Sequence, residues 1–119
     1  MARYVDGFLL PVPRRKLAAY AKISTKAGRV WKQHGALEYV ECVIDDLPKS
    51  WPTSFAKLAK AKPGEAVVFS WIVYKSRAHR DAVNKKVMTD PRMQVNDPKT
   101  MPFDHRRMAM AGFTTLVDL

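Results

Sequence analysis

The chain has 119 residues, which is enough for one hydrophobic core and too few for two independent domains. Its hydrophobic fraction of 47% excludes a disordered chain, although the net charge is +10. No apolar run approaches the roughly 20 residues of a membrane span, and the first residues lack the pattern of a signal peptide. The single Cys42 excludes an internal disulfide and fits a reducing compartment. We therefore expect one domain over residues 1–119, located in the cytoplasm, without a membrane partner.

The first half of the chain predicts a strand, a helix and a second strand. Residues 3–10 are rich in β-forming side chains and stop at two prolines, which indicates a strand. Residues 14–34 have the spacing of an amphipathic helix, with Gly35 in position for a left-handed C-terminal cap. Its outer face is strongly basic, and we interpret this face as a solvated surface in preference to a phosphate-binding one. Residues 36–45 follow as the second strand.

The second half repeats the alternation. A proline-containing connection over residues 46–65 includes a short helical turn near 54–60, and residues 66–74 form the clearest strand. Ser76 is a good N-cap for a helix that runs to about Thr89. A second proline-containing loop over 91–105 leads to a last strand at 107–116. The order β-α-β-β-α-β predicts an α+β, ferredoxin-like domain: a four-stranded antiparallel sheet with both helices on one face.

The strand over residues 66–74 is apolar on both faces, whereas a half-exposed antiparallel strand alternates apolar and polar residues. Two helices can cover only one face. The other face would expose either Trp71 or Ile72, with neighbours such as Phe8, Leu10, Met108 and Met110. Such a patch exceeds what monomers usually expose. We therefore expect a homodimer in which two sheets pack face to face as a dimeric α/β barrel. The alternative is that the long loops fold over the sheet.

Several runs resemble one bacterial family. They are Tyr4-Val5-Asp6-Gly7-Phe8, His34-Gly35-Ala36-Leu37-Glu38-Tyr39-Val40-Glu41, Phe69-Ser70-Trp71-Ile72-Val73-Tyr74, Ser76-Arg77-Ala78-His79-Arg80-Asp81, Asp90-Pro91-Arg92-Met93 and Met101-Pro102-Phe103-Asp104. This pattern is similar to the YbaA-like family, known as domain of unknown function 1428. The resemblance implies a cytoplasmic bacterial protein with a dimeric α/β-barrel fold, which is shared with cofactor-free monooxygenases, haem-degrading enzymes and muconolactone isomerase-like proteins. It implies no catalytic residue. Lys75 and His105 depart from the family pattern, in predicted turns.

Asp6 and His79 are the candidate catalytic residues. A carboxylate in an apolar strand is costly to bury without a partner, so Asp6 faces either a cleft or a wet strand end. His79 lies on the apolar side of its helix, where it is either a satisfied core histidine or a proton donor or acceptor. Arg80 beside it either binds a carboxylate or is solvated.

Four further residues are candidate ligand contacts. His34 and Glu38 are close in sequence and could meet across the helix cap, although an imidazole interacting with the helix dipole is the simpler interpretation. Glu38 and Glu41 fall on opposite faces of their strand, and only Glu38 is retained as a candidate. Phe69 and Trp71 either pack in a core or dimer interface or line an aromatic ligand pocket.

Two functions remain open. One is a cofactor-free small-molecule enzyme, of monooxygenase or isomerase type, that acts on an apolar or aromatic substrate. The other is a non-catalytic metabolite-binding or stress-associated protein. The three histidines lack metal-ligand spacing, so we expect no metal and no cofactor. Nucleic-acid binding is disfavoured because the run from Glu65 to Trp71 lacks the aromatic motif of RNA-recognition modules.

Overall fold

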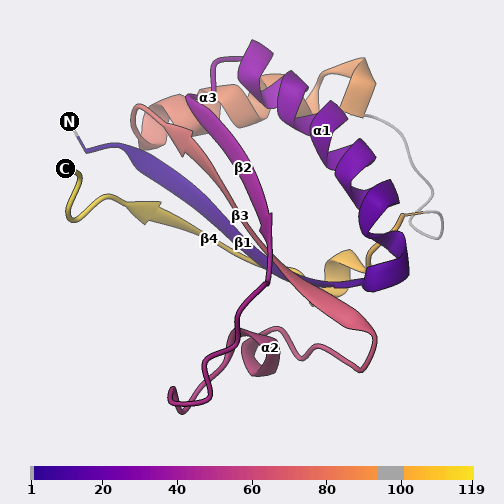
Figure 1. The fold of residues 1–119 in the computed structure, drawn as a ribbon. Coiled ribbons are helices and arrows are strands. Elements are labelled where there is room, and N and C mark those ends of the chain that lie inside the picture. The colour runs from indigo at the N-terminus through magenta and orange to yellow at the C-terminus, as the bar shows by residue number, and fades with distance from the viewer. Residues whose placement is uncertain (1, 94–100) are drawn as a thin grey trace.

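A computed structural model describes residues 2–93 and 101–119. It confirms the predicted α+β, ferredoxin-like order of elements (Figure 1). The strands and helices are β1 (Tyr4–Pro13), α1 (Leu17–Gln33), β2 (Glu38–Val43), α2 (Phe55–Leu58), β3 (Glu65–Tyr74), α3 (Arg77–Met88) and β4 (Ala109–Thr114). The four strands form one sheet in the order β2-β3-β1-β4, and each neighbouring pair is antiparallel. Part of the loop predicted over 91–105 lies outside the described residues.

The predicted C-terminal cap of the first helix and N-cap of the second are confirmed, whereas the first helix begins three residues later than predicted. Arg14–Lys16 form a 3₁₀ turn before α1. Gly35 follows α1 with a φ of 115°, a backbone conformation that is unfavourable for residues with a side chain. Ser76 caps α3, because its hydroxyl accepts a hydrogen bond from the backbone N–H of His79. Ser54 caps the short α2 in the same way, through the N–H of Lys57.

The first strand is longer than predicted, because it continues through Pro11 and Pro13. Its pairing with β3 extends to Pro13, whereas its pairing with β4 ends at Leu9. The two prolines occupy alternate positions, so both nitrogens point to the same side. This is the side on which β4 pairs with β1 up to Leu9. Beyond Leu9 no strand among the described residues is paired there, so the N–H groups that the prolines lack interrupt no hydrogen-bond ladder.

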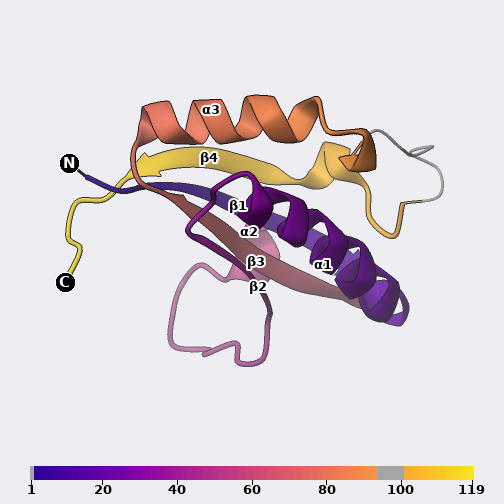
Figure 2. The ribbon, with the colours of Figure 1, turned by 90° about the horizontal axis from the view of Figure 1, so that it is seen from above.

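Both long helices lie over one face of the sheet, and α2 with its loops lies on the opposite side (Figures 1 and 2). The face under the helices, which we call the helix face, carries the core. Its buried residues form two clusters, with Ile72, Tyr74, Val30, Val83 and Val87 in one and Leu10, Val12, Val68 and Tyr20 in the other. The helix face of β3 is thus apolar, as predicted for both faces of this strand.

The opposite face, which we call the open face, carries Phe69 and Trp71. Of the two alternatives left open for the uncovered face, the structure has Trp71 there, and the register places Phe8 and Leu10 with Ile72 on the helix face, opposite Ser70 and Val68. Residues aligned with the open face are instead Val5, Leu9 and Phe113. The predicted alternative, a loop over the sheet, holds at one end, where Phe55 of α2 packs edge-on against Phe69 with ring centroids 5.7 Å apart.

Candidate functional site

A cleft of about 320 Å³ lies between the sheet and α1. Its walls are mainly apolar and aromatic, with Phe8, Leu10, Trp31, Ile72, Phe103 and Met108 among the lining residues. Its polar lining includes Tyr20, Ser24, Tyr39, Glu41 and Ser70. An apolar cavity with a few convergent polar groups is the usual form of a small-molecule site.

The polar group at the centre of this lining is the carboxylate of Glu41 on β2. The Tyr20 hydroxyl of α1 donates a hydrogen bond to Oε1 of Glu41. The Tyr39 hydroxyl donates to Oε2 over 2.9 Å. Burial, reinforced by the carboxylate, raises the pKa of both hydroxyls above the ordinary tyrosine value. Both phenols therefore stay protonated and act as donors to Glu41 at neutral pH.

Small residues on α1 make room for this arrangement. Gly28 packs directly over the Tyr39 ring, since a Cβ at this position would lie 2.6 Å from Cδ1 of Tyr39. The ring also packs against Trp31, with centroids 6.0 Å apart. Gly28 lies inside a helix, where glycine is unfavourable, and the aromatic ring beneath it explains why a side chain is excluded. The helix thus holds the Tyr39 hydroxyl at Glu41.

A second, larger hollow of about 680 Å³ lies between α1 and the edge strand β2. We call it the outer groove. It shares Tyr20, Ser24, Tyr39 and Glu41 with the cleft. Its own lining includes Thr25, Arg29 and Lys32 of α1. The cluster of Glu41 with its two tyrosines therefore stands between an inner apolar space and an outer space with basic residues.

Asp6 is buried, with 1% of its surface exposed, and it has a cationic partner. Nη1 of Arg80 lies 2.6 Å from Oδ1 of Asp6. Nε of the same guanidinium donates to Asp81 over 2.7 Å, and the group lies 4.9 Å from the ring centroid of Tyr4. The predicted interaction of Arg80 with a carboxylate is therefore present, but the carboxylate belongs to the protein. Asp6 does not line the cleft.

Next to this pair, Asn84 ties α1 to β3. Its Oδ1 accepts hydrogen bonds from Nε1 of Trp31 over 3.1 Å and from the Tyr74 hydroxyl over 3.2 Å. Burial, followed by the charge of Asp6, raises the pKa of Tyr74. These bonds hold the Trp31 ring in the wall of the cleft.

His79 is half-buried at the start of α3 and takes part in the β3–α3 turn. Its Nδ1 accepts a hydrogen bond from the backbone N–H of Lys75 over 3.0 Å. Its ring packs edge-on against Tyr74, with centroids 6.1 Å apart. These contacts are those of a satisfied histidine, and His79 does not line the cleft.

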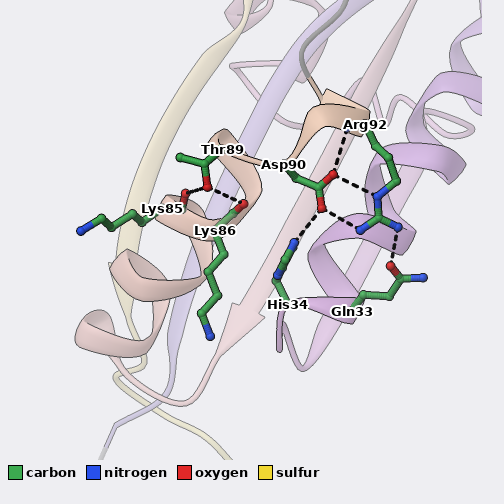
Figure 3. Close-up of polar contacts among 7 residues, drawn as sticks. All are labelled: Gln33, His34, Lys85, Lys86, Thr89, Asp90 and Arg92. Carbon is green, nitrogen blue, oxygen red and sulfur yellow. Dashed lines mark hydrogen bonds and ion pairs between the residues drawn. The ribbon is translucent and has the colours of Figure 1, made fainter.

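His34 and Glu38 have different partners. Nε2 of His34 lies 2.9 Å from Oδ2 of Asp90, which also binds the guanidinium of Arg92 (Figure 3). Arg92, and after it His34, lowers the pKa of Asp90. Glu38 is exposed on the open face and lies 3.7 Å from Nη1 of Arg3. The predicted contact of His34 with Glu38 is therefore corrected: His34 joins the end of α1 to the segment after α3.

Phe69 and Trp71 lie ring to ring on the open face, with centroids 5.6 Å apart. The register places both rings on the side of the sheet opposite the Glu41 cluster, although Trp71 is also among the residues that line the cleft and Phe69 is not. Glu41, which was not retained as a candidate from its sequence position, lies on the helix face and lines the cleft, whereas Glu38 lies on the open face. Two features of the sequence could have indicated Glu41. Tyr39 and Glu41 share one face of the strand by their spacing, and the apolar side of the preceding helix carries the polar residues Tyr20 and Ser24.

Two general features complete the description. Within residues 2–93 and 101–119, no group of three or more His, Cys, Asp or Glu side chains is arranged to hold a metal ion. Over the same described part of the chain, no helix has both the length and the apolar character needed to cross a bilayer.

The sequence matches a known protein family over most of the chain. Residues 3–105 match the family model described as "Protein of unknown function (DUF1428)", and the chain belongs to this family. It is 46% identical over 116 residues to the uncharacterized protein YbaA of Escherichia coli strain K12, an alignment that covers 98% of each chain. The YbaA protein of Shigella flexneri matches to the same extent. Among solved structures, an uncharacterized NIPSNAP domain protein from Burkholderia xenovorans shares the fold, with a TM-score of 0.53, 16% identity and coverage of 92% of this chain and 91% of that one.

Proposed function

We propose that the chain binds a small, largely apolar or aromatic molecule in the cleft between the sheet and α1. The observation that supports this most directly is Glu41: a half-buried carboxylate, held by two neutral phenols, in a cleft whose other walls are mainly apolar. Glu41 and the two phenol oxygens present hydrogen-bond acceptors to the cleft. The ligand expected there is therefore an apolar body with a hydroxyl or amine that donates to this cluster.

Catalysis without a cofactor is the second candidate function, and the same carboxylate favours it. Glu41 is an acceptor for a proton from a bound molecule, and Tyr20 and Tyr39 are positioned to stabilise either state through their hydroxyls. Asp6 and His79 were the predicted proton carriers, but their contacts are with Arg80 and Lys75. We assign the proton-accepting role to Glu41. Monooxygenase-like and isomerase-like reactions on an aromatic substrate both use such a group.

Binding of naphthol, measured by calorimetry, tests the proposed site. Naphthol carries an aromatic body and one hydroxyl donor. We expect it to bind and expect Glu41→Gln to weaken binding by roughly ten-fold or more, the effect of losing one charge-assisted hydrogen bond of about 1.5 kcal/mol. Glu38→Gln is the matched control, because the same change is made on the same strand on the opposite face. Equal effects of the two substitutions, or no binding of naphthol, would contradict the proposal.

We also propose that two copies pack through their open faces to form a cytoplasmic homodimer. Large apolar side chains remain exposed there: Phe69 is 43% exposed and Phe113 is 55% exposed. Burying such side chains contributes roughly 1.5–3 kcal/mol each. Light scattering tests this proposal, with twice the chain mass of 13.5 kDa expected. Phe113→Lys should produce monomers, whereas Met88→Lys, at an exposed methionine on α3, should not. A wild-type monomer at micromolar concentration would refute the dimer.

A further inference from the structure

The cleft and the outer groove meet at the Glu41 cluster. Apart from Glu41 itself, the charged residues that line the two hollows are positive. Glu41 is the only carboxylate that lines either hollow in the described part of the chain. Four cationic residues line them: Lys26 and Arg92 at the cleft, and Arg29 and Lys32 at the outer groove. An excess of positive charge around an apolar cavity favours a ligand with an anionic group.

The partners of these cations indicate where that anionic group binds. Arg92 is bound to Asp90 by two hydrogen bonds from its guanidinium, so its charge is compensated. Lys32 donates to the backbone carbonyl of Leu37 over 2.8 Å, which holds its ammonium at the end of the groove without neutralising it. Arg29 is exposed along the same groove. The uncompensated charge is thus greatest in the outer groove.

The distance along α1 constrains the shape of the ligand. Ser24 lines both hollows. Arg29 lies five residues further along α1, which is about 7.5 Å of helix rise. A carboxylate joined directly to the apolar body would lie beside Glu41 and be repelled by it. A carboxylate on a linker of a few carbon atoms reaches past Ser24 to the guanidinium of Arg29, and the small side chain of Ser24 leaves room for such a linker.

Building on the proposed function of the cleft, we propose that the natural ligand is an apolar or aromatic group joined by a short flexible linker to a terminal anionic group, a carboxylate or its equivalent. The apolar part occupies the cleft. The anionic end lies in the outer groove at Arg29, with Lys32 as a second cation. The outer groove is therefore a subsite that selects anionic ligands, and the Glu41 cluster separates the two parts of the molecule.

Three probes with the same aromatic group test this proposal by calorimetry: naphthylbutyrate, naphthylacetate and the neutral naphthylbutanol. We expect naphthylbutyrate to bind more tightly than naphthylbutanol, and naphthylacetate to bind more weakly than naphthylbutyrate because its carboxylate lies beside Glu41. Arg29→Gln should weaken naphthylbutyrate roughly five-fold, as for one exposed charge pair, and leave naphthylbutanol unchanged. Arg15→Gln is the matched control, since Arg15 is exposed and lines neither hollow.

The outcomes separate this proposal from the one it builds on. Equal binding of naphthylbutyrate and naphthylbutanol refutes the anionic subsite and leaves the cleft as a ligand site. Equal losses from Arg29→Gln and Arg15→Gln also refute it, because a general effect of net charge then explains the preference. If Lys26→Gln weakens naphthylbutyrate and Arg29→Gln does not, the anionic end binds at the cleft and the groove assignment is wrong. If naphthol binds and none of the three probes does, this proposal fails alone; if naphthol does not bind either, the proposed function fails as well.

Discussion

Replacing Gly28 by alanine tests the packing that places Tyr39 at Glu41. In an exposed helix interior this change stabilises by about 1 kcal/mol, because glycine loses more backbone freedom on folding. Here the new Cβ would lie 2.6 Å from Cδ1 and 2.8 Å from Cε1 of Tyr39. The Tyr39 ring is rigid. It also packs against the Trp31 ring, and its hydroxyl donates a hydrogen bond to Glu41. Either the ring or the helix must therefore move.

The opposing effects give the expected size of the change. Overpacking of this kind costs about 1–3 kcal/mol. Displacing the Tyr39 hydroxyl from a carboxylate costs a further amount of about 1–2 kcal/mol. After the gain in helix propensity is subtracted, we expect Gly28→Ala to lower the free energy of unfolding by about 1–4 kcal/mol. Urea unfolding measures this as a lower midpoint with an unchanged slope.

Two backgrounds distinguish the packing explanation from a general intolerance of Gly28. In Tyr39→Phe the ring remains, so Gly28→Ala should still destabilise. In Tyr39→Ala the ring is gone, so the same substitution should be neutral or stabilise by up to about 1 kcal/mol. If Gly28→Ala stabilises the otherwise unchanged protein, the close contact between α1 and the Tyr39 ring is refuted. The placement of the Tyr39 hydroxyl at Glu41 is then refuted as well.

The buried pair of Asp6 and Arg80 should respond asymmetrically. Arg80→Met leaves Asp6 buried without a cation and should lower the free energy of unfolding by about 3–5 kcal/mol. Asp6→Asn leaves an arginine that still binds Asp81, so it should lower this free energy by less. Equal losses of stability in urea unfolding would contradict this assignment. A second ion pair predicts acid sensitivity: Arg107 lowers the pKa of Glu65 from 4.5 to about 2. Because the pKa is lower in the folded state, this pair stabilises fully above pH 4.5 and its contribution is lost as pH falls toward 2. The stability gap between wild type and Arg107→Gln should therefore shrink on acidification, and a constant gap would exclude this role.

The fold was predictable because its signals are local and repeated. Alternation in β3 gave the two faces of the sheet, and Ser76 and Gly35 gave the ends of the helices. The end of β1 was not predictable, because it depends on where β4 stops. Prolines at positions 11 and 13 normally end a strand, and only the length of a partner distant in sequence makes them acceptable.

The site was predictable only in part. The sequence indicated that Glu38 and Glu41 face opposite ways, and the register confirms this. It did not indicate which face the helices cover, because β3 is apolar on both. Because of that ambiguity, the pattern of β3 could not indicate which of the two glutamates lines the cleft. The same limit applies to His34: its partner Asp90 is 56 residues away, and no short-range pattern joins them.

The partners of buried Asp6 and of half-buried Glu41 distinguish a structural carboxylate from one that is available to a ligand. Asp6 is bound by a guanidinium, so a molecule that displaced this contact would leave a cation and an anion unpaired in the interior. Glu41 is bound by two neutral hydroxyls, which satisfy hydrogen bonds without cancelling its charge. A donor group on a ligand therefore gains a charged acceptor at Glu41 without breaking an ion pair. On this reasoning a carboxylate marks a binding site by the charge that its partners leave uncompensated, and in this cleft that carboxylate is Glu41.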